Sequence, residues 1–302
     1  MKKVLPTINK MLKVINMEIN PNTKICINSH TRLYCIFGNP VKHSLSPIIQ
    51  NSAFISSGIN SVYIAFEVNN IKDAISAMKI LHISGASVTI PFKRDAINYL
   101  DEIDPLAQSI GSINTLINSN GKIMGYNTDG YGVISSLIQK GIDIKKSSFL
   151  IIGNGGSARA IAFTLLNYGA KIIIAGRNEN RIIHLVNDLN ENSYNVEYRL
   201  IKNITHTFIE EVDVIINTTP VGMTPDITST PLDEGFILKR HTIFDIVYSP
   251  PNTKLLRIGA EKGCKTIPGI EMLLHQGAKQ FEIWTGIKAP YDIMKRSLEK
   301  YI

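Results

Sequence analysis

The stretch Ser148-Phe149-Leu150-Ile151-Ile152-Gly153-Asn154-Gly155-Gly156-Ser157-Ala158 decides the fold. Its apolar start predicts a buried strand over 148–153, and the residues from 156 to 170 have the pattern of a helix. The turn between them fits the G-x-G-x-x-G/A pattern of a dinucleotide site. Gly153 would allow the tight turn, Gly155 would let the backbone approach a pyrophosphate, and Ala158 would let the helix pack on the strand. The alternative is a glycine turn used only for packing.

The residues after the turn suggest which dinucleotide is bound. The backbone N–H groups at the start of the helix would hold the phosphates. The next strand, 171–176, ends without the Asp or Glu that usually accepts the ribose hydroxyls of NAD. It runs instead into Arg177 and Asn178, with Arg181 one turn later. Guanidinium groups bind a 2′-phosphate through charge-assisted hydrogen bonds, so we predict NADP(H), with Arg177 at the 2′-phosphate. Arg181 is either a second contact or a solvated helix residue.

The rest of the chain alternates in the same way. Its 302 residues suggest about two domains. In the first block, strands are predicted at 33–38, 62–68 and 85–90, and helices at 46–58 and 71–84. Ser46 is the expected N-cap of the first helix, and Pro47 its first residue. In the second block, further strands are predicted at 212–219 and 242–248, and a connecting helix is expected at 127–141. The pattern predicts two α/β domains, each a parallel sheet covered by helices.

Composition excludes several classes of protein. Apolar residues make up 44% and charged residues 19%, which is typical of a folded chain rather than a disordered one. No apolar run of about 18 residues predicts a membrane span, and the first residues lack the apolar core of a signal peptide. The three cysteines, Cys26, Cys35 and Cys264, have no metal-ligand spacing and favour a reducing cytoplasm. We therefore expect no metal and no membrane.

The net charge of +7 fits anionic ligands but does not identify them. Residues 1–26, which we interpret as an N-terminal extension, hold five lysines and one acid, Glu18, so they supply over half of the surplus. The remaining basic residues are scattered rather than striped, and no nucleic-acid-binding motif is present. Nucleic-acid binding is therefore not expected.

Polar residues follow the predicted strands of the first block. Ligands of open α/β sheets bind outside the carboxyl ends of the strands. Hydroxyl, amide, ammonium and carboxylate groups gathered there suit a small polyhydroxylated acid. Each group alone has a plainer explanation, such as a helix cap, a turn residue or a surface charge. The residues are Ser44, Ser46, Thr89, Lys93, Asn114 and Asp129.

An ordered series of motifs over about 27–302 closely resembles the shikimate dehydrogenase family. In the first block the motifs are Gly38-Asn39-Pro40-x-x-His43-Ser44-x-Ser46-Pro47, Val88-Thr89-x-Pro91-Phe92-Lys93, Gly111-x-x-Asn114-Thr115 and Gly125-Tyr126-Asn127-Thr128-Asp129-Gly130. In the second block, besides the glycine turn, they are Arg177-x-x-x-Arg181, Asn217-x-Thr219-Pro220-x-Gly222-Met223, Asp245-x-x-Tyr248-x-Pro250 and Gly269-x-x-Met272-Leu273-x-x-Gln276.

The resemblance implies NADPH-dependent reduction of 3-dehydroshikimate to shikimate, a step in aromatic amino acid (chorismate) biosynthesis. It implies that Lys93 and Asp129 form the catalytic pair, and that Ser44 and Ser46 bind the substrate carboxylate with help from Tyr248. Reduction of a ketone needs a proton at the nascent alkoxide, and a lysine beside that oxygen can supply it. The residues implied for the ring hydroxyls are Thr89, Asn114, Asp129 and Gln276. The residues expected at the cofactor are Gly153, Gly155, Gly156, Ser157, Ala158, Arg177, Asn178, Arg181, Thr219 and Gly269.

Two positions depart from the pattern of this family. Ser87 stands where the family usually has an asparagine that contacts the substrate, so we expect a weaker or water-mediated contact. Gly176 stands where an asparagine usually precedes the cofactor arginine, so packing at the adenine is expected to differ.

The resemblance also implies a division into domains. The expected architecture is a substrate domain over 27–128, completed by 271–302, and a Rossmann-type NADP-binding domain over 129–270. A cleft is expected between them, and the chain is expected to be a monomer or a homodimer.

The sequence leaves two alternatives to this function open. One is a quinate/shikimate dehydrogenase that uses NAD as well as NADP, against which the Arg177 and Arg181 pair argues. The other is a non-catalytic NADP-binding sensor, against which the presence of both Lys93 and Asp129 argues. Rates on shikimate and quinate with each cofactor would separate the alternatives.

Overall fold

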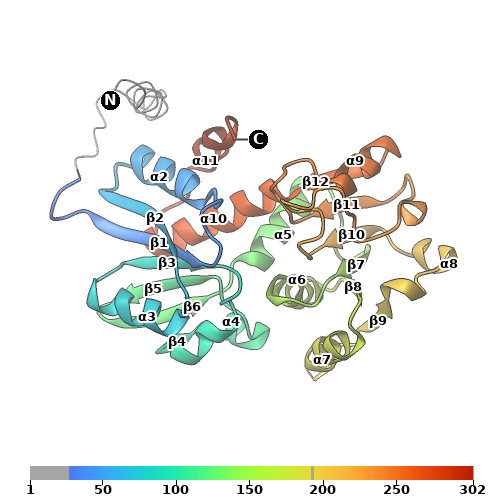
Figure 1. Cartoon of the computed structure of the whole chain (residues 1–302), viewed down its shortest axis with the longest axis horizontal. Helices are drawn as coiled ribbons and strands as arrows, with labels where there is room; N and C mark the ends of the chain where they lie inside the picture. The colour runs from blue at the N-terminus through green and yellow to red at the C-terminus, as the bar shows by residue number, and fades with distance from the viewer. Residues whose placement is uncertain (1–26, 192–193, 302) are drawn as a thin grey trace.

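Two six-stranded sheets, each covered by helices, form two lobes that lie side by side (Figure 1). The computed structural model describes residues 27–191 and 194–301. The predicted N-terminal extension, 1–26, lies outside the described residues. The chain therefore has the predicted α/β architecture with two sheets.

The first sheet has the strand order β2-β1-β3-β5-β6-β4. β1 pairs in parallel with β2 and with β3, as predicted. β5 is antiparallel to β3 and to β6, which was not predicted. The β5–β6 turn contains Asn120 and Gly121, both with positive φ, as a tight two-residue hairpin requires. The strands are β1 (Arg32–Gly38), β2 (Ser61–Glu67), β3 (Gly85–Val88), β4 (Glu102–Ile103), β5 (Thr115–Ser119) and β6 (Lys122–Tyr126).

Helices cover both faces of the first sheet. One face packs on α2, α10 and α11 through an apolar cluster that includes Tyr34, Phe54 and Trp284. The other face packs on α3, η1 and α4 through a cluster that includes Met78. α10 reaches this sheet from the far end of the chain, and Trp284 Nε1 donates to the Leu116 carbonyl at 2.9 Å. The helices are α2 (Ser46–Ser56), α3 (Ile71–Ile80), η1 (Asp95–Tyr99), α4 (Pro105–Ile110), α10 (Gly269–Thr285) and α11 (Tyr291–Leu298).

The second sheet is parallel throughout, with the order β12-β11-β10-β7-β8-β9. The strand order reverses between β7 and β10, which is where a Rossmann fold opens a crevice for its dinucleotide. The strands are β7 (Ser148–Ile152), β8 (Lys171–Gly176), β9 (Glu197–Leu200), β10 (Val214–Asn217), β11 (Thr242–Asp245) and β12 (Lys265–Pro268).

The helices of this lobe separate into two layers. α5, α6 and α7 share the apolar cluster on one face, and α8 and α9 contribute to the cluster on the other. α5 packs against both α6 and α10 at the junction of the lobes (Figure 1). A Cβ added at Gly130 of α5 would lie 1.9 Å from Thr164 Oγ1, so glycine permits this close crossing of α5 and α6. The elements are α5 (Asp129–Gln139), α6 (Gly156–Asn167), α7 (Glu179–Asn190), η2 (Ile201–Asn203), α8 (His206–Ile209), η3 (Glu234–Phe236) and α9 (Lys254–Glu261).

The prediction that Ser46 caps α2 is wrong. Ser46 is the first helical residue, and the preceding Leu45, which occupies the N-cap position, already has helical backbone angles and makes no side-chain capping hydrogen bond. Ser44 Oγ instead accepts a hydrogen bond from the Ser46 backbone N–H at 3.2 Å. The Ser46 hydroxyl is therefore not used at the helix end.

Candidate active site

A pocket of about 280 Å³ lies between the lobes, close to the usual size range of small-molecule sites. The structure brings every predicted catalytic and substrate-binding residue to this pocket, together with three of the predicted cofactor residues. Those from the first lobe and the start of α5 are Ser44, Ser46, Thr89, Lys93, Asn114 and Asp129. Those from the second lobe and α10 are Ser157, Thr219, Tyr248, Gly269 and Gln276.

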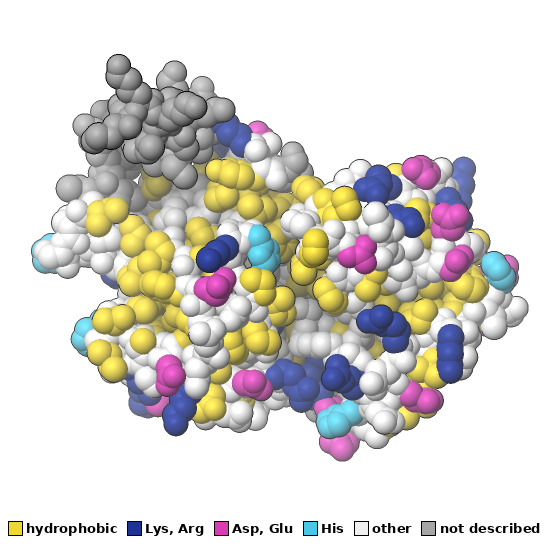
Figure 2. Space-filling model, in the orientation of Figure 1, with side chains coloured by type: hydrophobic (Ala, Val, Ile, Leu, Met, Phe, Trp, Pro, Cys, Tyr) yellow, Lys and Arg dark blue, Asp and Glu magenta, His cyan; other side chains and the backbone are white. Residues whose placement is uncertain are grey.

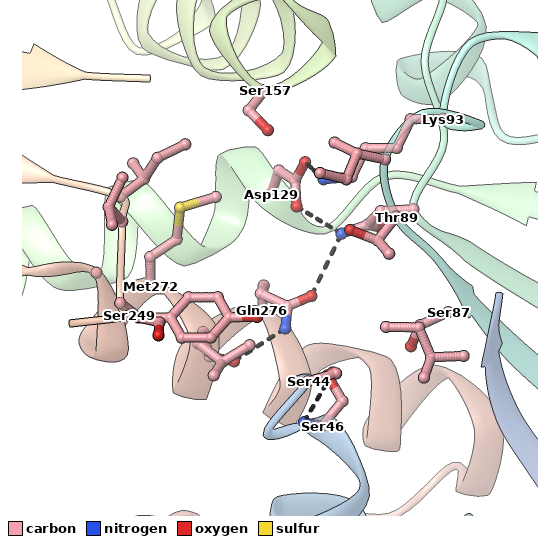
Figure 3. Close-up of a pocket in the computed structure, with 18 of the residues that line it drawn as sticks. Ser44, Ser46, Ser87, Thr89, Lys93, Asp129, Ser157, Ser249, Met272 and Gln276 are labelled. Atoms are coloured by element: carbon pink, nitrogen blue, oxygen red, sulfur yellow. Dashed lines mark hydrogen bonds and ion pairs between the residues drawn. The ribbon is translucent and has the colours of Figure 1, made fainter. Parts of the chain in front are cut away.

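The side chains of Lys93 and Asp129 both line the pocket and point toward each other (Figure 3). Lys93 Nζ lies 2.5 Å from Asp129 Oδ2, and their side chains are 14% and 4% exposed. Lys93 lies in the turn after β3, whereas Asp129 is the first residue of α5. Asp129 thus places its acidic side chain at the start of a helix, where the backbone N–H groups favour such a residue. The pair is an ammonium held beside a cavity by a largely buried acid, not a surface charge.

Asn114 fixes the other oxygen of Asp129. The Asn114 Oδ1 atom accepts from the Thr128 backbone N–H at 2.8 Å and from Thr115 Oγ1 at 2.7 Å. A backbone N–H can only donate, so the amide of Asn114 has one orientation. Its Nδ2 donates to Asp129 Oδ1 at 2.7 Å and to Gln276 Oε1 at 3.3 Å. Asn114 is therefore a buried positioning residue, not merely a turn residue.

The opposite end of the pocket holds the two serines (Figure 3). Ser46 is buried, whereas Ser44 is half-buried. Tyr248 follows β11, and burial raises the pKa of its hydroxyl, so it stays a neutral hydrogen-bond donor. Three hydroxyls can thus meet one anionic group at the end of the pocket away from Lys93.

Ser87, which lines the pocket, is hydrogen-bonded to two buried residues outside the predicted site, Tyr63 and Gln280. Tyr63 Oη donates to Ser87 Oγ at 2.7 Å, and Ser87 Oγ donates to Gln280 Oε1 at 2.9 Å. The Nε2 atom of Gln280 donates to the Asn114 carbonyl at 3.1 Å. Because that carbonyl only accepts, the Nε2 atom of Gln280 must face it and the Oε1 atom must face Ser87, so the Ser87 hydroxyl donates its hydrogen to Gln280. The spacing of Gln280 one turn after Gln276 was the available signal; nothing local indicated Tyr63.

The glycine turn connects β7 to α6 as predicted. Gly153 has φ +130°, and a Cβ there would lie 2.3 Å from Thr218 Oγ1, so the turn itself requires glycine. A Cβ at Gly155 would meet no atom within 4 Å, so protein packing does not require glycine there. Gly156 and Ser157 begin α6, and Ser157 projects toward the pocket (Figure 3). Free backbone N–H groups beside open space are the arrangement that holds phosphates.

Arg177 and Arg181 lie outside the pocket, exposed after β8 and on the first turn of α7. Between them, Asn178 Oδ1 accepts from the Arg181 backbone N–H at 3.1 Å and so caps α7. Gly176 is buried beside Ile182, whose Cδ1 would lie 3.1 Å from an added Cβ. The two guanidinium groups are thus free to meet an anion beyond the turn.

Gly269 begins α10, and an added Cβ would lie 2.4 Å from the Ile246 carbonyl oxygen. Glycine therefore lets α10 start directly against the loop after β11. Thr219 is held by Asn217, whose Oδ1 accepts from its N–H at 3.0 Å.

Neither metal-site nor membrane-span features occur in the described part of the chain. Residues 27–191 and 194–301 contain no group of three or more His, Cys, Asp or Glu side chains placed to hold a metal ion. Within the same ranges, no helix is long and apolar enough to cross a membrane. On the face drawn in Figure 2, basic and acidic side chains are interspersed and form no continuous basic stripe.

Three family models match the chain in order. They are the shikimate dehydrogenase substrate binding domain over residues 36–116, shikimate/quinate 5-dehydrogenase over 136–253, and the shikimate 5′-dehydrogenase C-terminal domain over 269–299.

Individual proteins match over almost their whole length. The NADP(+) shikimate dehydrogenase of Moorella thermoacetica is 39% identical over 91% of this chain and 95% of its own. The NADP(+) shikimate dehydrogenase of Methanosphaera stadtmanae is 41% identical over 91% of this chain and 99% of its own. A crystal structure of a shikimate dehydrogenase in complex with NADP+ superposes with a TM-score of 0.87, at 38% identity over 92% of this chain and 98% of that one.

Proposed function

Because the chain belongs to the shikimate dehydrogenase family, we propose that it catalyses the reversible NADPH-dependent reduction of 3-dehydroshikimate to shikimate. This reaction is a step in aromatic amino acid and chorismate biosynthesis. The observation that carries the proposal is the Lys93–Asp129 pair, 2.5 Å apart in a pocket that Ser157, at the start of α6, also lines.

The polar groups of the pocket match the substrate at both ends. In this proposal Ser44, Ser46 and Tyr248 bind the carboxylate, because three hydroxyl donors suit one anion. Thr89, Asn114, Asp129 and Gln276 bind ring hydroxyls. Ser87 also lines the pocket but donates its hydrogen to Gln280, so it can meet a ligand only as an acceptor.

Lys93 and Asp129 perform the proton chemistry. When bound, the reduced nicotinamide supplies a hydride to the carbonyl carbon, and the oxygen then needs a proton. The Lys93 ammonium stabilises the charge that develops on that oxygen and delivers the proton. Asp129 holds the ammonium in place and accepts a hydrogen bond from the neighbouring hydroxyl. In the oxidation of shikimate, the same pair removes the proton.

The second lobe fits NADP(H). In this proposal the N–H groups of Gly156 and Ser157 hold the pyrophosphate, and the bare Cα of Gly155 lets it approach the turn. Gly153 and Ala158 shape the turn and the helix behind it. Arg177, with Arg181 and the capping residue Asn178, binds the 2′-phosphate. Thr219 and Gly269 border the nicotinamide side of the pocket.

The division into a substrate domain (27–128 with 271–302) and a cofactor domain (129–270) belongs to this proposal. The packing of α10 and α11 on the first sheet supports it. We place the enzyme in the cytoplasm, as a monomer or homodimer that acts on small molecules and has no nucleic-acid partner.

One experiment separates this function from its alternatives. Initial rates of the pure protein are measured on shikimate and on quinate, each with NADP+ and with NAD+. The proposal expects the combination of shikimate and NADP+ to have the highest kcat/KM. Comparable rates on quinate with NAD+ would instead identify a quinate/shikimate dehydrogenase, and the absence of shikimate-dependent NADPH formation would indicate a non-catalytic NADP-binding protein.

A further inference from the structure

Asp245 is a buried acid beneath the pocket. It is the last residue of β11, and it is fully buried. It does not line the pocket itself, but Thr219 on one side, and Val247 and Tyr248 on the other, do so. The proton chemistry proposed above does not use this carboxyl.

Three donors meet the Asp245 carboxyl group. Asn217 Nδ2 and the Val247 backbone N–H donate to Oδ1 at 2.9 and 3.0 Å. Thr253 Oγ1 donates to Oδ2 at 2.7 Å. These bonds join the end of β10, the loop after β11 and the N-cap of α9. The groups that face Asp245 from these elements are thus all neutral.

The hydrogen-bond donors around Asp245 are oriented to bind an ionised carboxylate. Asn217 Oδ1 accepts from the Thr219 backbone N–H at 3.0 Å, which can only donate, so Nδ2 must face Asp245. A proton on Oδ1 would therefore meet two donors. A proton on Oδ2 would require the Thr253 hydroxyl to turn, although its oxygen already accepts from the Leu256 backbone N–H at 3.3 Å.

We propose that Asp245 is a positioning residue whose carboxylate holds the two pocket loops, 217–220 and 245–249, in the arrangement that binds substrate and cofactor. Asp245 holds the Asn217 amide, which in turn accepts from the Thr219 backbone N–H. Asp245 also accepts from the Val247 N–H and so holds the backbone next to Tyr248. The inference rests on the proposed function, because it assigns these loops to that reaction.

Stability and activity should change in opposite directions as Asp245 ionises. Burial raises the pKa of Asp245 to about 6. The folded state then binds this proton more tightly than the unfolded state, so this group's contribution to stability falls as pH rises from about 4 to about 6. The hydrogen-bond network, in contrast, is complete only when the carboxylate is ionised, so activity rises over the same range. If Asp245 had a purely structural role, activity would fall together with stability as pH rises.

The test compares wild type with Asp245→Asn at pH 5 to 9. Above pH 7 we expect wild type to have about tenfold higher kcat/KM, the effect of one charge-assisted hydrogen bond. Below pH 6 the ratio should approach one, while the melting temperature of wild type relative to the variant rises. A ratio that stays constant with pH, or that follows the melting temperature, would overturn the proposal. Asp73→Asn, an exposed acid in the first turn of α3, serves as the control and should keep the wild-type profile.

A second variant keeps the test decisive if Asp245→Asn does not fold. Thr253→Val removes a hydrogen bond to the carboxylate form, so the acid limb of kcat/KM should move to higher pH. Thr253→Ser should restore the wild-type limb, because it keeps the hydroxyl. An unmoved limb in Thr253→Val contradicts the proposal.

Failure of the proposed function can be distinguished from failure of this inference. If wild type forms no NADPH from shikimate at any pH, the proposed reaction is wrong. The rise in melting temperature that NADP+ causes then reports on the loops without catalysis. A smaller rise in Asp245→Asn than in wild type above pH 7, with equal rises below pH 6, supports the positioning role; equal rises at every pH overturn it.

Discussion

Lys93 Nζ lies 2.5 Å from Asp129 Oδ2, although the two residues are 36 positions apart and belong to different elements. Asn114 holds the second oxygen of the same carboxylate at 2.7 Å. The ammonium therefore has a fixed place at the pocket surface before any ligand arrives, and side chains held in this way need little rearrangement during catalysis.

Replacing Lys93 with alanine should remove the proton donor and the charge that stabilises the alkoxide. We expect kcat to fall by about 10²- to 10⁴-fold, with a much smaller change in the KM for shikimate. Steady-state kinetics at neutral pH measure both. Lys122→Ala, which removes an exposed ion pair with Glu102, is the control and should leave both constants unchanged. A large rise in KM with an unchanged kcat would make Lys93 a binding group.

Asp129→Asn should lower kcat as well, because the amide cannot hold the ammonium as a carboxylate does. If the two residues act as one unit, the double variant Lys93→Ala/Asp129→Asn should lose little more than Lys93→Ala alone. Independent roles predict multiplied losses instead. The four kcat values of this double-mutant cycle decide between the two results.

Two glycines of the turn should respond differently to alanine. Gly153→Ala places a Cβ against Thr218 at a positive φ, so we expect the free energy of unfolding to fall by about 1–3 kcal/mol. Gly155→Ala meets no protein atom, so the melting temperature should stay near that of wild type while the KM for NADPH rises. Thermal unfolding and NADPH kinetics test the pair. Normal NADPH binding by Gly155→Ala would show that no phosphate approaches this residue.

Arg177→Ala should weaken NADPH binding and leave NADH binding almost unchanged, since only NADPH carries the 2′-phosphate. Loss of a hydrogen bond between charged groups is worth about 1.5–3 kcal/mol, which corresponds to a rise in the KM for NADPH of about 10- to 100-fold. Arg296→Ala, on the exposed face of α11, is the matched control. Equal changes in the KM for NADPH and for NADH would contradict the assignment.

Ser46→Ala tests the corrected role of this serine. Because Ser46 is the first helical residue and not the N-cap of α2, thermal stability should change little. The KM for shikimate should rise by about tenfold for a lost hydrogen bond to the carboxylate. A large fall in melting temperature with an unchanged KM would restore the helix-cap interpretation.

The sequence by itself determined the features that depend on short stretches of backbone. The apolar run of β7, the glycines after it and the helix that follows specify a strand–turn–helix unit through local sterics and periodicity, and the alternation along the chain predicted two α/β sheets. The absence of an acid after β8, together with the presence of Arg177, indicated NADP. The charge that would complement a 2′-phosphate lies in this single short segment. The strand–turn–helix unit and the two α/β sheets were predicted correctly because neighbouring residues are sufficient to define them.

The tertiary structure alone decided which distant groups meet. The order of the strands places Lys93 against Asp129, and the return of α10 to the first sheet places Gln280 behind Ser87. The burial of Asp245 under two loops depends on β10, β11 and α9 together. Such contacts are fixed by the packing of whole elements, and no local pattern carries that information.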